Sequence, residues 1–183
     1  MGNRKQWAPA LIFLAFAVAP SSAEITRLEV EGIDNYSRYE GETSFAGNRV
    51  GFGGATDPGA MPWLKQQGYA SVVNLRVTAE EGADVDESRM AAVASGLKYI
   101  HLPFDPNDPA PSIPQAFLTA TADTGNQPTF IHCASGTRAA MFWMLGRMRI
   151  DGLGMEAVEG EGRIIAEKPD EAVTYFSTRM LAQ

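Results

Sequence analysis

The sequence predicts a single α/β domain with a mainly parallel central sheet flanked by helices, and three observations lead to this fold class. Short runs rich in valine, leucine and isoleucine alternate with longer segments of helical periodicity, which is the pattern of β-α-β units. The 183 residues are 45% hydrophobic and 20% charged, a globular composition that can bury a sizeable core. No internal repeat and no low-complexity stretch points to another architecture.

Residues 1–23 are expected to be a secretory signal peptide rather than part of the fold. Arg4 and Lys5 give a basic start, residues 8–20 are apolar almost throughout, and small residues precede a cleavage site after Ala23. An uncleaved membrane anchor is the alternative, but the apolar run is shorter than the roughly 20 residues that span a bilayer. No cysteine lies near the cleavage site, which excludes a lipid anchor there. We therefore expect an exported protein, periplasmic in a Gram-negative bacterium, with no membrane contact after cleavage.

The segment that follows, residues 24–47, is expected to be an N-terminal lead-in. Residues 25–30 alternate enough to predict a short strand, whereas residues 35–47 show no clear period and predict a loop. Residues 49–52 then predict a strand that ends in the tight turn Gly53-Gly54. The main domain is therefore expected over residues 48–183.

Strands and helices alternate through this main domain. Buried-type strands are predicted over residues 70–75, 98–102 and 128–132, and helices over 57–67, 86–95, 115–124, 138–148, 154–166 and 169–181. Asp57-Pro58 supplies an N-cap and a proline at the first helical position. Met90, Ala91 and Val93 are expected to face inward, and the proline-rich residues 103–114 to be irregular. The helix over 138–148 is apolar on every face, which predicts a position in the centre of the domain.

Charge and composition exclude several classes of function. The formal net charge is −7, and removal of residues 1–23 leaves 13 basic against 22 acidic residues, or −9. Such an acidic domain is not expected to bind nucleic acid, which needs a basic face. One cysteine, Cys133, excludes an internal disulfide, and two histidines, His101 and His132, argue against a zinc site. No metal or organic cofactor is indicated.

The most informative segment joins the strand over 128–132 to the apolar helix. Backbone N–H groups of Ala134, Ser135, Gly136 and Thr137, together with the start of the helix, can form an anion cradle. Gly136 lets the backbone turn sharply, and Arg138 adds a planar, permanently charged fork for an oxyanion. Cys133 lies at the mouth of this positive field, which favours the nucleophilic thiolate.

Each of these residues also has a simpler interpretation. Cys133 can be a small core residue, and Arg138 a surface charge at a helix start. For His132, a bond to a neighbouring backbone group that supports the loop is favoured over direct proton transfer. Arg76 ends a strand at the edge where ligands bind, and we expect it to pair with Glu80 or Glu81.

The loop from His132-Cys133 to Arg138 resembles the signature loop of cysteine-dependent protein tyrosine phosphatases, above all the dual-specificity-like branch. The wider resemblance is to the phosphatase-like domain of bacterial beta-lactamase hydrolase-like proteins, and it covers roughly residues 45–165. The motifs that carry it occur in the family's order: Gly53-Gly54, Asn74-Leu75-Arg76 with Glu80 or Glu81, Leu102-Pro103, and Cys133-Ala134-Ser135-Gly136-Thr137-Arg138.

The resemblance implies a phosphatase that acts on phosphotyrosine-like or other phosphomonoesters, carried by a protein or a small molecule. Cys133 would attack phosphorus and form a cysteinyl-phosphate, while Arg138 and the amides of 134–138 hold the phosphoryl oxygens. An aspartate after the preceding strand would protonate the leaving oxygen and then activate water. The candidates are Asp105 and Asp108, and Asp105 is favoured because it is nearer the strand end. Either aspartate can instead cap a turn beside proline.

Two departures from the tyrosine phosphatase pattern keep other functions open. Four residues separate Cys133 from Arg138 instead of five, which is also the spacing of rhodaneses, where the cysteine carries a persulfide sulfur. Ala139 stands where phosphatases carry a serine or threonine that helps to expel the thiolate; Ser135 or Thr137 could take that part. The alternatives are therefore a rhodanese-like sulfurtransferase and a non-catalytic oxyanion-binding module.

Overall fold

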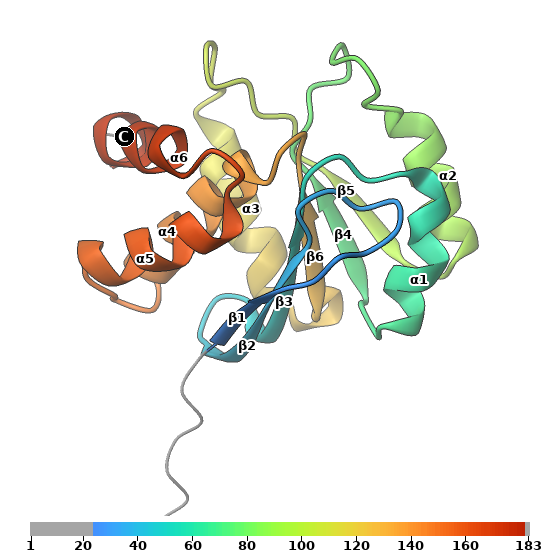
Figure 1. The fold of residues 1–183 in the computed structure, drawn as a ribbon, viewed down its shortest axis with the longest axis horizontal. Coiled ribbons are helices and arrows are strands. Elements are labelled where there is room, and N and C mark those ends of the chain that lie inside the picture. The colour runs from blue at the N-terminus through green and yellow to red at the C-terminus, as the bar shows by residue number, and fades with distance from the viewer. Residues whose placement is uncertain (1–23, 182–183) are drawn as a thin grey trace, which may run out of the picture.

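A six-stranded sheet forms the centre of the protein, which a computed structural model describes over residues 24–181 (Figure 1). The predicted signal peptide, residues 1–23, lies outside the described residues. The strands are β1 (Glu24–Arg27), β2 (Ser37–Thr43), β3 (Gly47–Gly53), β4 (Ser71–Asn74), β5 (Lys98–His101) and β6 (Thr129–His132). The helices are α1 (Met61–Gln66), α2 (Val85–Ala94), α3 (Ser112–Ala122), α4 (Thr137–Arg149), α5 (Met155–Ile165) and α6 (Pro169–Tyr175).

The strand order is β1-β2-β3-β6-β4-β5, and the prediction of a mainly parallel α/β fold is confirmed. β3, β6, β4 and β5 run parallel, while β1 and β2 add an antiparallel edge. β6 lies between β3 and β4, and the register aligns Gly53 and Asn74 with His132. The carboxyl ends of the three central strands therefore meet at one edge, the place where open parallel sheets bind ligands.

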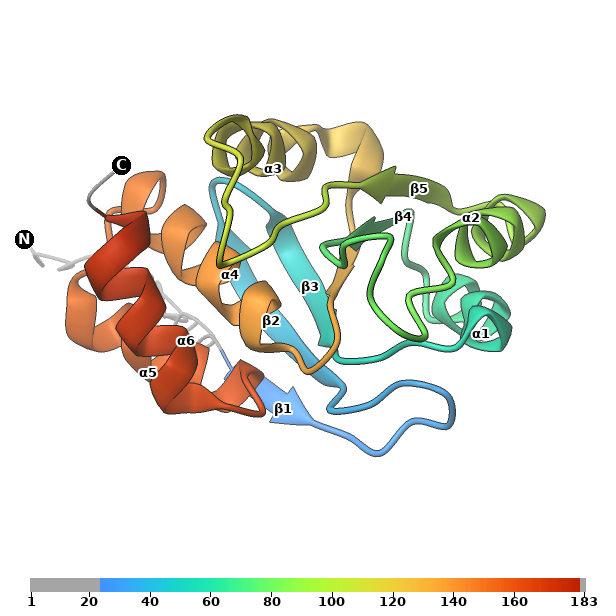
Figure 2. The same cartoon turned by 90° about the horizontal axis from the view of Figure 1, so that it is seen from above.

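Helices cover both faces of the sheet. α1 and α2 pack on one face and α3 to α6 on the other (Figures 1 and 2). The prediction for α4 is confirmed, because all of its residues from Ala139 to Arg147 are buried. Trp143 at its middle is fully buried, and its ring contacts those of Tyr39, Phe45 and Phe52. This aromatic core fixes the N-terminus of α4 against the edge of the sheet.

The expected loop over residues 35–47 is wrong, because most of it forms β2. Ser37 and Tyr39 point inward and are buried, while β3 pairs with the strand along one side and β1 along the other. β1 is also shorter than expected and ends at Arg27. Strand formation here depends on cross-strand pairing and burial rather than on local propensity. The N-terminal lead-in is therefore built into the sheet.

The helical predictions need two corrections. Met90 and Val93 do not face inward: they are 67% and 64% exposed, whereas Val85, Ser88 and Ala92 form the buried face of α2. Small residues let α2 approach the sheet closely, so the larger side chains turn outward. α3 begins at Ser112 rather than at residue 115, because prolines are tolerated in a first helical turn, where amides have no acceptor.

The other expected strands and helices are confirmed to within a few residues. The start of the first helix is confirmed in detail: Asp57 accepts a hydrogen bond from the Gly59 amide at 2.6 Å, and a short 3₁₀ turn over Pro58–Ala60 leads into α1. At the other end of the chain, α6 continues into a π-helical segment over Phe176–Met180. Between residues 24 and 181, no helix is both long enough and apolar enough to cross a bilayer.

Candidate active site

The candidate site lies where β6 ends at the carboxyl edge of the sheet. Residues 133–138, called the Cys133 loop below, connect β6 to the start of α4. Gly136 turns this loop with a φ of +76°. A Cβ atom at this position would lie 2.7 Å from Asn35 Nδ2 and 3.0 Å from the Ile165 carbonyl oxygen. Both the backbone conformation and the tight packing therefore require glycine here.

Three segments distant in sequence hold the carbonyl groups of the Cys133 loop away from its interior. The Ala55 amide donates to the Ala134 oxygen at 2.9 Å, and the Glu167 amide donates to the Ser135 oxygen at 3.2 Å. Asn35 Nδ2 lies 3.4 Å from the Ser135 oxygen and 2.7 Å from the Ile165 oxygen.

The amides of the same loop are left without such partners. Within residues 24–181, the N–H groups of Ser135, Thr137 and Arg138 have no hydrogen-bond acceptor. Because the carbonyls are turned outward and the loop leads into the N-terminus of a 13-residue helix, the unpaired amides can gather around one anion.

Arg138 completes the cradle through a fixed guanidinium. Its Nη1 and Nη2 atoms donate to the two carboxylate oxygens of Glu80 at 2.5 and 2.7 Å. Nη1 also approaches the carbonyl oxygens of Leu75 and Phe104, both at 3.1 Å. The Nε–H and the second Nη2–H lie on the other edge of the guanidinium, and neither has a partner within the described residues. This free edge is the one that can bind an oxyanion through two parallel hydrogen bonds.

Glu80 is held in the ionised form that this pairing requires. Its partial burial disfavours the charge, but hydrogen bonds from Arg138 and from the Val77 amide outweigh burial and lower the pKa of the carboxyl. Arg76 packs behind it and is 6% exposed; its Nε lies 3.4 Å from Glu80 Oε2, and its other donors reach the carbonyls of Glu81 and Gly82. The expected structural pairing of Arg76 is therefore confirmed.

A pocket of about 460 Å³ opens above the Cys133 loop. Ser135, Thr137 and Arg138 line it from the loop, and Glu80 and Asp105 line it from the segments that follow β4 and β5. The hydroxyls of Ser135 and Thr137 lie 3.0 Å apart on its wall. Ala139 is fully buried and outside the pocket lining.

Cys133, the first residue of the loop, is not among the residues that line this pocket. The side chain is 1% exposed and belongs to the core beside α4. Burial disfavours the charged Arg138 guanidinium, but Glu80 and then Cys133 outweigh this effect and raise the pKa of Arg138. The sulfur and the guanidinium therefore lie within electrostatic reach of each other.

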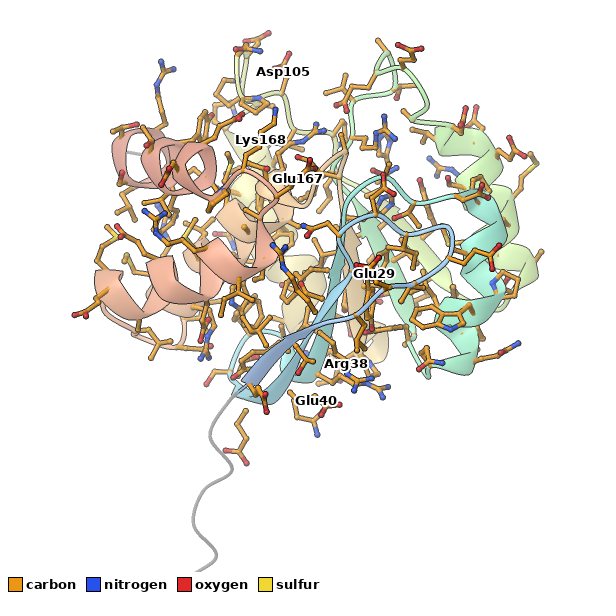
Figure 3. The ribbon with its side chains drawn as sticks, viewed as in Figure 1. Glu29, Arg38, Glu40, Asp105, Glu167 and Lys168 are labelled. Carbon is orange, nitrogen blue, oxygen red and sulfur yellow. The ribbon has the colours of Figure 1, made fainter. Side chains whose placement is uncertain are left out.

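The two acid candidates differ in position. Asp105 lines the pocket, and its Oδ1 accepts a hydrogen bond from the Asn107 amide at 2.8 Å. Figure 3 shows Asp105 at the upper end of the molecule, on the loop that rises above the sheet after β5. Asp108 is exposed and is not part of the pocket lining. The geometry favours Asp105 as the proton donor.

The His132 ring lies close to the backbone of Gly54 and Cys133, the kind of neighbouring group that the sequence suggested, but without a well-formed hydrogen bond to either. Neither ring nitrogen has a partner within residues 24–181, and the ring stacks on Phe130 at 5.7 Å. Burial lowers the pKa of His132 to about 3, with a further contribution from the nearby Arg76 charge. Since side chains alternate along β6, His132 faces the α1 side of the sheet and Cys133 the α4 side. The ring is therefore a neutral packing group.

Sequence reasoning missed two residues that shape the site. Glu80 was expected to pair with Arg76, and it does, but its two-point contact with Arg138 was not foreseen; the signals were a glutamate after a strand end and its place in the motif that begins at Asn74. Asn35 reaches the Cys133 loop from the N-terminal segment, and nothing local in the sequence indicates this contact. Within the part of the chain that the structure describes, no three His, Cys, Asp or Glu side chains gather as metal ligands.

Comparisons with known proteins agree with this geometry. The family defined as "Beta-lactamase hydrolase-like protein, phosphatase-like domain" matches residues 49–150. A beta-lactamase hydrolase-like protein from Xylella fastidiosa is 33% identical over 121 residues, which make up 63% of this chain and 27% of that relative. The match thus spans about a quarter of the relative's length.

Two solved structures show the same fold at low sequence identity. The catalytic domain of the PP-IP phosphatase Siw14 from Saccharomyces cerevisiae, in complex with citrate, has a TM-score of 0.60 at 15% identity; the alignment covers 82% of this chain and 88% of that one. TpbA from Pseudomonas aeruginosa, in complex with phosphotyrosine, has a TM-score of 0.53 at 12% identity and coverages of 83% and 96%. The central sheet and its helices are therefore those of cysteine phosphatases.

Proposed function

Because this chain belongs to the family of phosphatase-like domains found in beta-lactamase hydrolase-like proteins, we propose that it is a cysteine-dependent phosphatase that hydrolyses phosphomonoesters through a cysteinyl-phosphate. The observation that carries the proposal is the free edge of the Arg138 guanidinium. Glu80 holds the opposite edge, so the free Nε–H and Nη2–H, together with the loop amides, can bind the oxygens of one phosphoryl group above Cys133. Donors fixed in advance stabilise charge that develops on these oxygens during transfer.

The reaction has two steps. The Cys133 thiolate attacks phosphorus, the bond from phosphorus to the ester oxygen breaks, and protonated Asp105 gives its proton to that leaving oxygen. Water then attacks phosphorus, the Asp105 carboxylate accepts its proton, and the phosphorus–sulfur bond breaks to release phosphate and the thiolate. The Ser135 or Thr137 hydroxyl can stabilise the departing thiolate, in the absence of a hydroxyl at Ala139.

The substrate class is a phosphomonoester, of which phosphotyrosine is one example. TpbA, which shares the fold, has been crystallised with phosphotyrosine. The pocket wall formed by Val77, Ala79 and Pro106 is apolar, which suits the carbon frame of an ester beside the phosphoryl group.

The direct test is hydrolysis of p-nitrophenyl phosphate by residues 24–183 under reducing conditions between pH 5 and 8. We expect turnover that Cys133→Ser lowers by at least about a thousandfold, because serine is a much weaker nucleophile at neutral pH. Circular dichroism of both proteins controls for folding. If folded protein with a free thiol shows no turnover, the assignment fails. A gain of one sulfur mass at Cys133 after thiosulfate treatment would then favour sulfur transfer, and phosphate binding alone would favour an oxyanion-binding module.

We also propose that the chain is exported and that residues 1–23 act as its signal peptide. The basic, apolar and small-residue segments in that order support this proposal. Mass spectrometry of the protein from a periplasmic fraction should give an N-terminus at Glu24, and recovery of the full-length chain in the membrane fraction would contradict it.

A further inference from the structure

The pocket above the Cys133 loop continues into a second depression, called the α6 groove below. The two share Pro106, Asn107 and Glu171, so they form one continuous surface between the loop after β5 and the helix α6. Figure 2 shows α6 running away from the start of α4. The groove has a volume of about 620 Å³, which is far more than one phosphoryl group needs. A substrate that uses it must extend beyond its phosphate.

The charges in the pocket favour a substrate with only one phosphate. Arg138 is the single base among the lining residues, and its charge is already matched by Glu80. The remaining charged residues of the pocket are Asp105 and Glu171. A second phosphate a few ångströms from the first would therefore meet the Glu171 carboxylate and the oxygens of Asp105, and no unpaired cation among the lining residues, which is unfavourable at this range.

The charges along the groove favour a cation at the next position of the substrate. Asp170 and Glu171 lie in the first turn of α6, and Arg179 at the far end is the only base in the lining. Asp170 contacts Arg163 at 2.6 Å, and Glu171 contacts Lys168 at 3.7 Å. Both pairs are exposed, so each is worth little and can be exchanged for a pair with a bound cation.

Tyr175 forms an aromatic part of the groove wall. Its ring meets Phe104 edge-on at 5.9 Å, which fixes its orientation. Its hydroxyl is shielded from solvent and has no hydrogen-bond partner within residues 24–181. The covered hydroxyl cannot reach a ligand in the groove, but the half-buried ring can pack against a peptide that lies there.

We propose that the substrate is a singly phosphorylated peptide segment with a basic side chain beside the phosphorylated residue, and that this segment lies in the α6 groove. Arg138 and the Cys133 loop take the phosphate, the Tyr175 ring packs against the peptide, and Glu171 with Asp170 takes the basic side chain. The proposal rests on the proposed phosphatase function for turnover, but peptide binding tests it separately.

The test compares two phosphotyrosine peptides that differ only in lysine or glutamate on both sides of the phosphotyrosine. Dissociation constants are measured on the Cys133→Ser protein, which cannot turn them over, at low salt. We expect the lysine peptide to bind about fivefold more tightly, the value of roughly one modest ion pair. Inositol hexakisphosphate, a polyanion, should compete poorly with it.

Glu171→Lys in the same background should abolish or invert this preference, because it reverses the charge where the two depressions meet. The Glu171 side chain is 61% exposed, so its replacement leaves the fold intact. The matched control is Glu156→Lys, an exposed glutamate in the first turn of α5, which should leave the ratio of the two constants unchanged.

Equal binding of the two peptides, tighter binding of the glutamate peptide, or strong competition by inositol hexakisphosphate would each overturn the groove proposal. The two proposals also fail differently. Discrimination between the peptides without turnover of any phosphomonoester by the unmodified protein would refute the phosphatase function and leave the groove assignment standing.

Discussion

Two loops at the same edge of the sheet are held in different ways. The first three residues of the Cys133 loop are each tied to a distant segment: the Cys133 amide to the Gly53 oxygen, the Ala134 oxygen to Ala55, and the Ser135 oxygen to both Glu167 and Asn35. The loop over residues 102–111, called the Asp105 loop below, is anchored through Phe104, whose amide and carbonyl bond to Leu75 and Arg138. Beyond Phe104 its hydrogen bonds are to itself, within the described residues.

This difference separates two tasks in phosphoryl transfer. The donors of the anion cradle are already in place before a ligand binds. No further free energy is needed to reorganise them, and fixed donors of this kind stabilise a transition state. The proton donor is one residue beyond an anchor, on a loop with few tertiary bonds, and such a loop opens at a low free-energy cost. Substitutions that loosen the Cys133 loop should therefore weaken phosphate binding and lower the rate of phosphoryl transfer together. Substitutions in the Asp105 loop should affect proton transfer alone.

Of the changes that separate the two loops, Asp105→Asn should have the largest effect. Loss of the proton donor should lower kcat by about a hundredfold for an ester with a poor leaving group such as phenyl phosphate, with little change in KM. The loss should be smaller for p-nitrophenyl phosphate, whose leaving group needs less protonation. Asp108→Asn is the matched control and should stay within about twofold. A similar loss for both variants would show that the whole loop, rather than one carboxyl, matters.

A smaller effect is expected when one tie of the Cys133 loop is cut. Asn35→Gly keeps the left-handed φ of 51° available but removes the amide group that donates to Ser135 and Ile165. We expect kcat/KM to fall about tenfold and inorganic phosphate to bind more weakly, as a misplaced cradle predicts. The control is Asp84→Gly, because Asp84 also has a positive φ and lies outside the pocket lining. Weaker catalysis with unchanged phosphate binding would contradict the claim that the Cys133 loop supports binding and chemistry together.

The smallest expected effect is on the pH dependence of the free energy of unfolding. It comes from His132, the residue before the Cys133 loop. The folded-state pKa of His132, about 3, is far below the 6.5 of an unfolded chain. Below pH 6.5 the histidine binds a proton in the unfolded chain but stays neutral in the folded protein. The free energy of unfolding therefore falls as the pH is lowered toward 3. The slope approaches about 1.4 kcal/mol per pH unit.

This dependence can be measured by urea unfolding between pH 5 and 7, above the range in which Glu80 takes up a proton. His132→Gln should be less stable at pH 7 because its packing on Phe130 is lost, yet its stability should fall less steeply with decreasing pH. Parallel curves for the two proteins would mean that the buried ring does not carry the proton linkage.

The strands and the Cys133 loop could be predicted because their signals are local. β4 and β6 are short apolar runs, and the spacing from Cys133 to Arg138 places a cysteine, a glycine and an arginine around one turn. β2 could not be predicted, since Ser37 and Tyr39 become strand residues only when β1 and β3 pair with them. The Glu80–Arg138 pair and the Asn35 contact link residues 58 and 100 positions apart, and no local pattern encodes such distances.

The ties on Ser135 also have a consequence for the order of folding. Its carbonyl is bonded to Asn35, 100 positions earlier, and to Glu167, and neither partner lies in the 49–150 region that defines the family. Bringing such distant segments together carries a loop-closure cost in chain entropy, so contacts of this kind form late. The anion cradle is then complete only once both ends of the domain have docked. A bound phosphate ion would in turn stabilise that final arrangement, because it binds the finished fold and not its precursors.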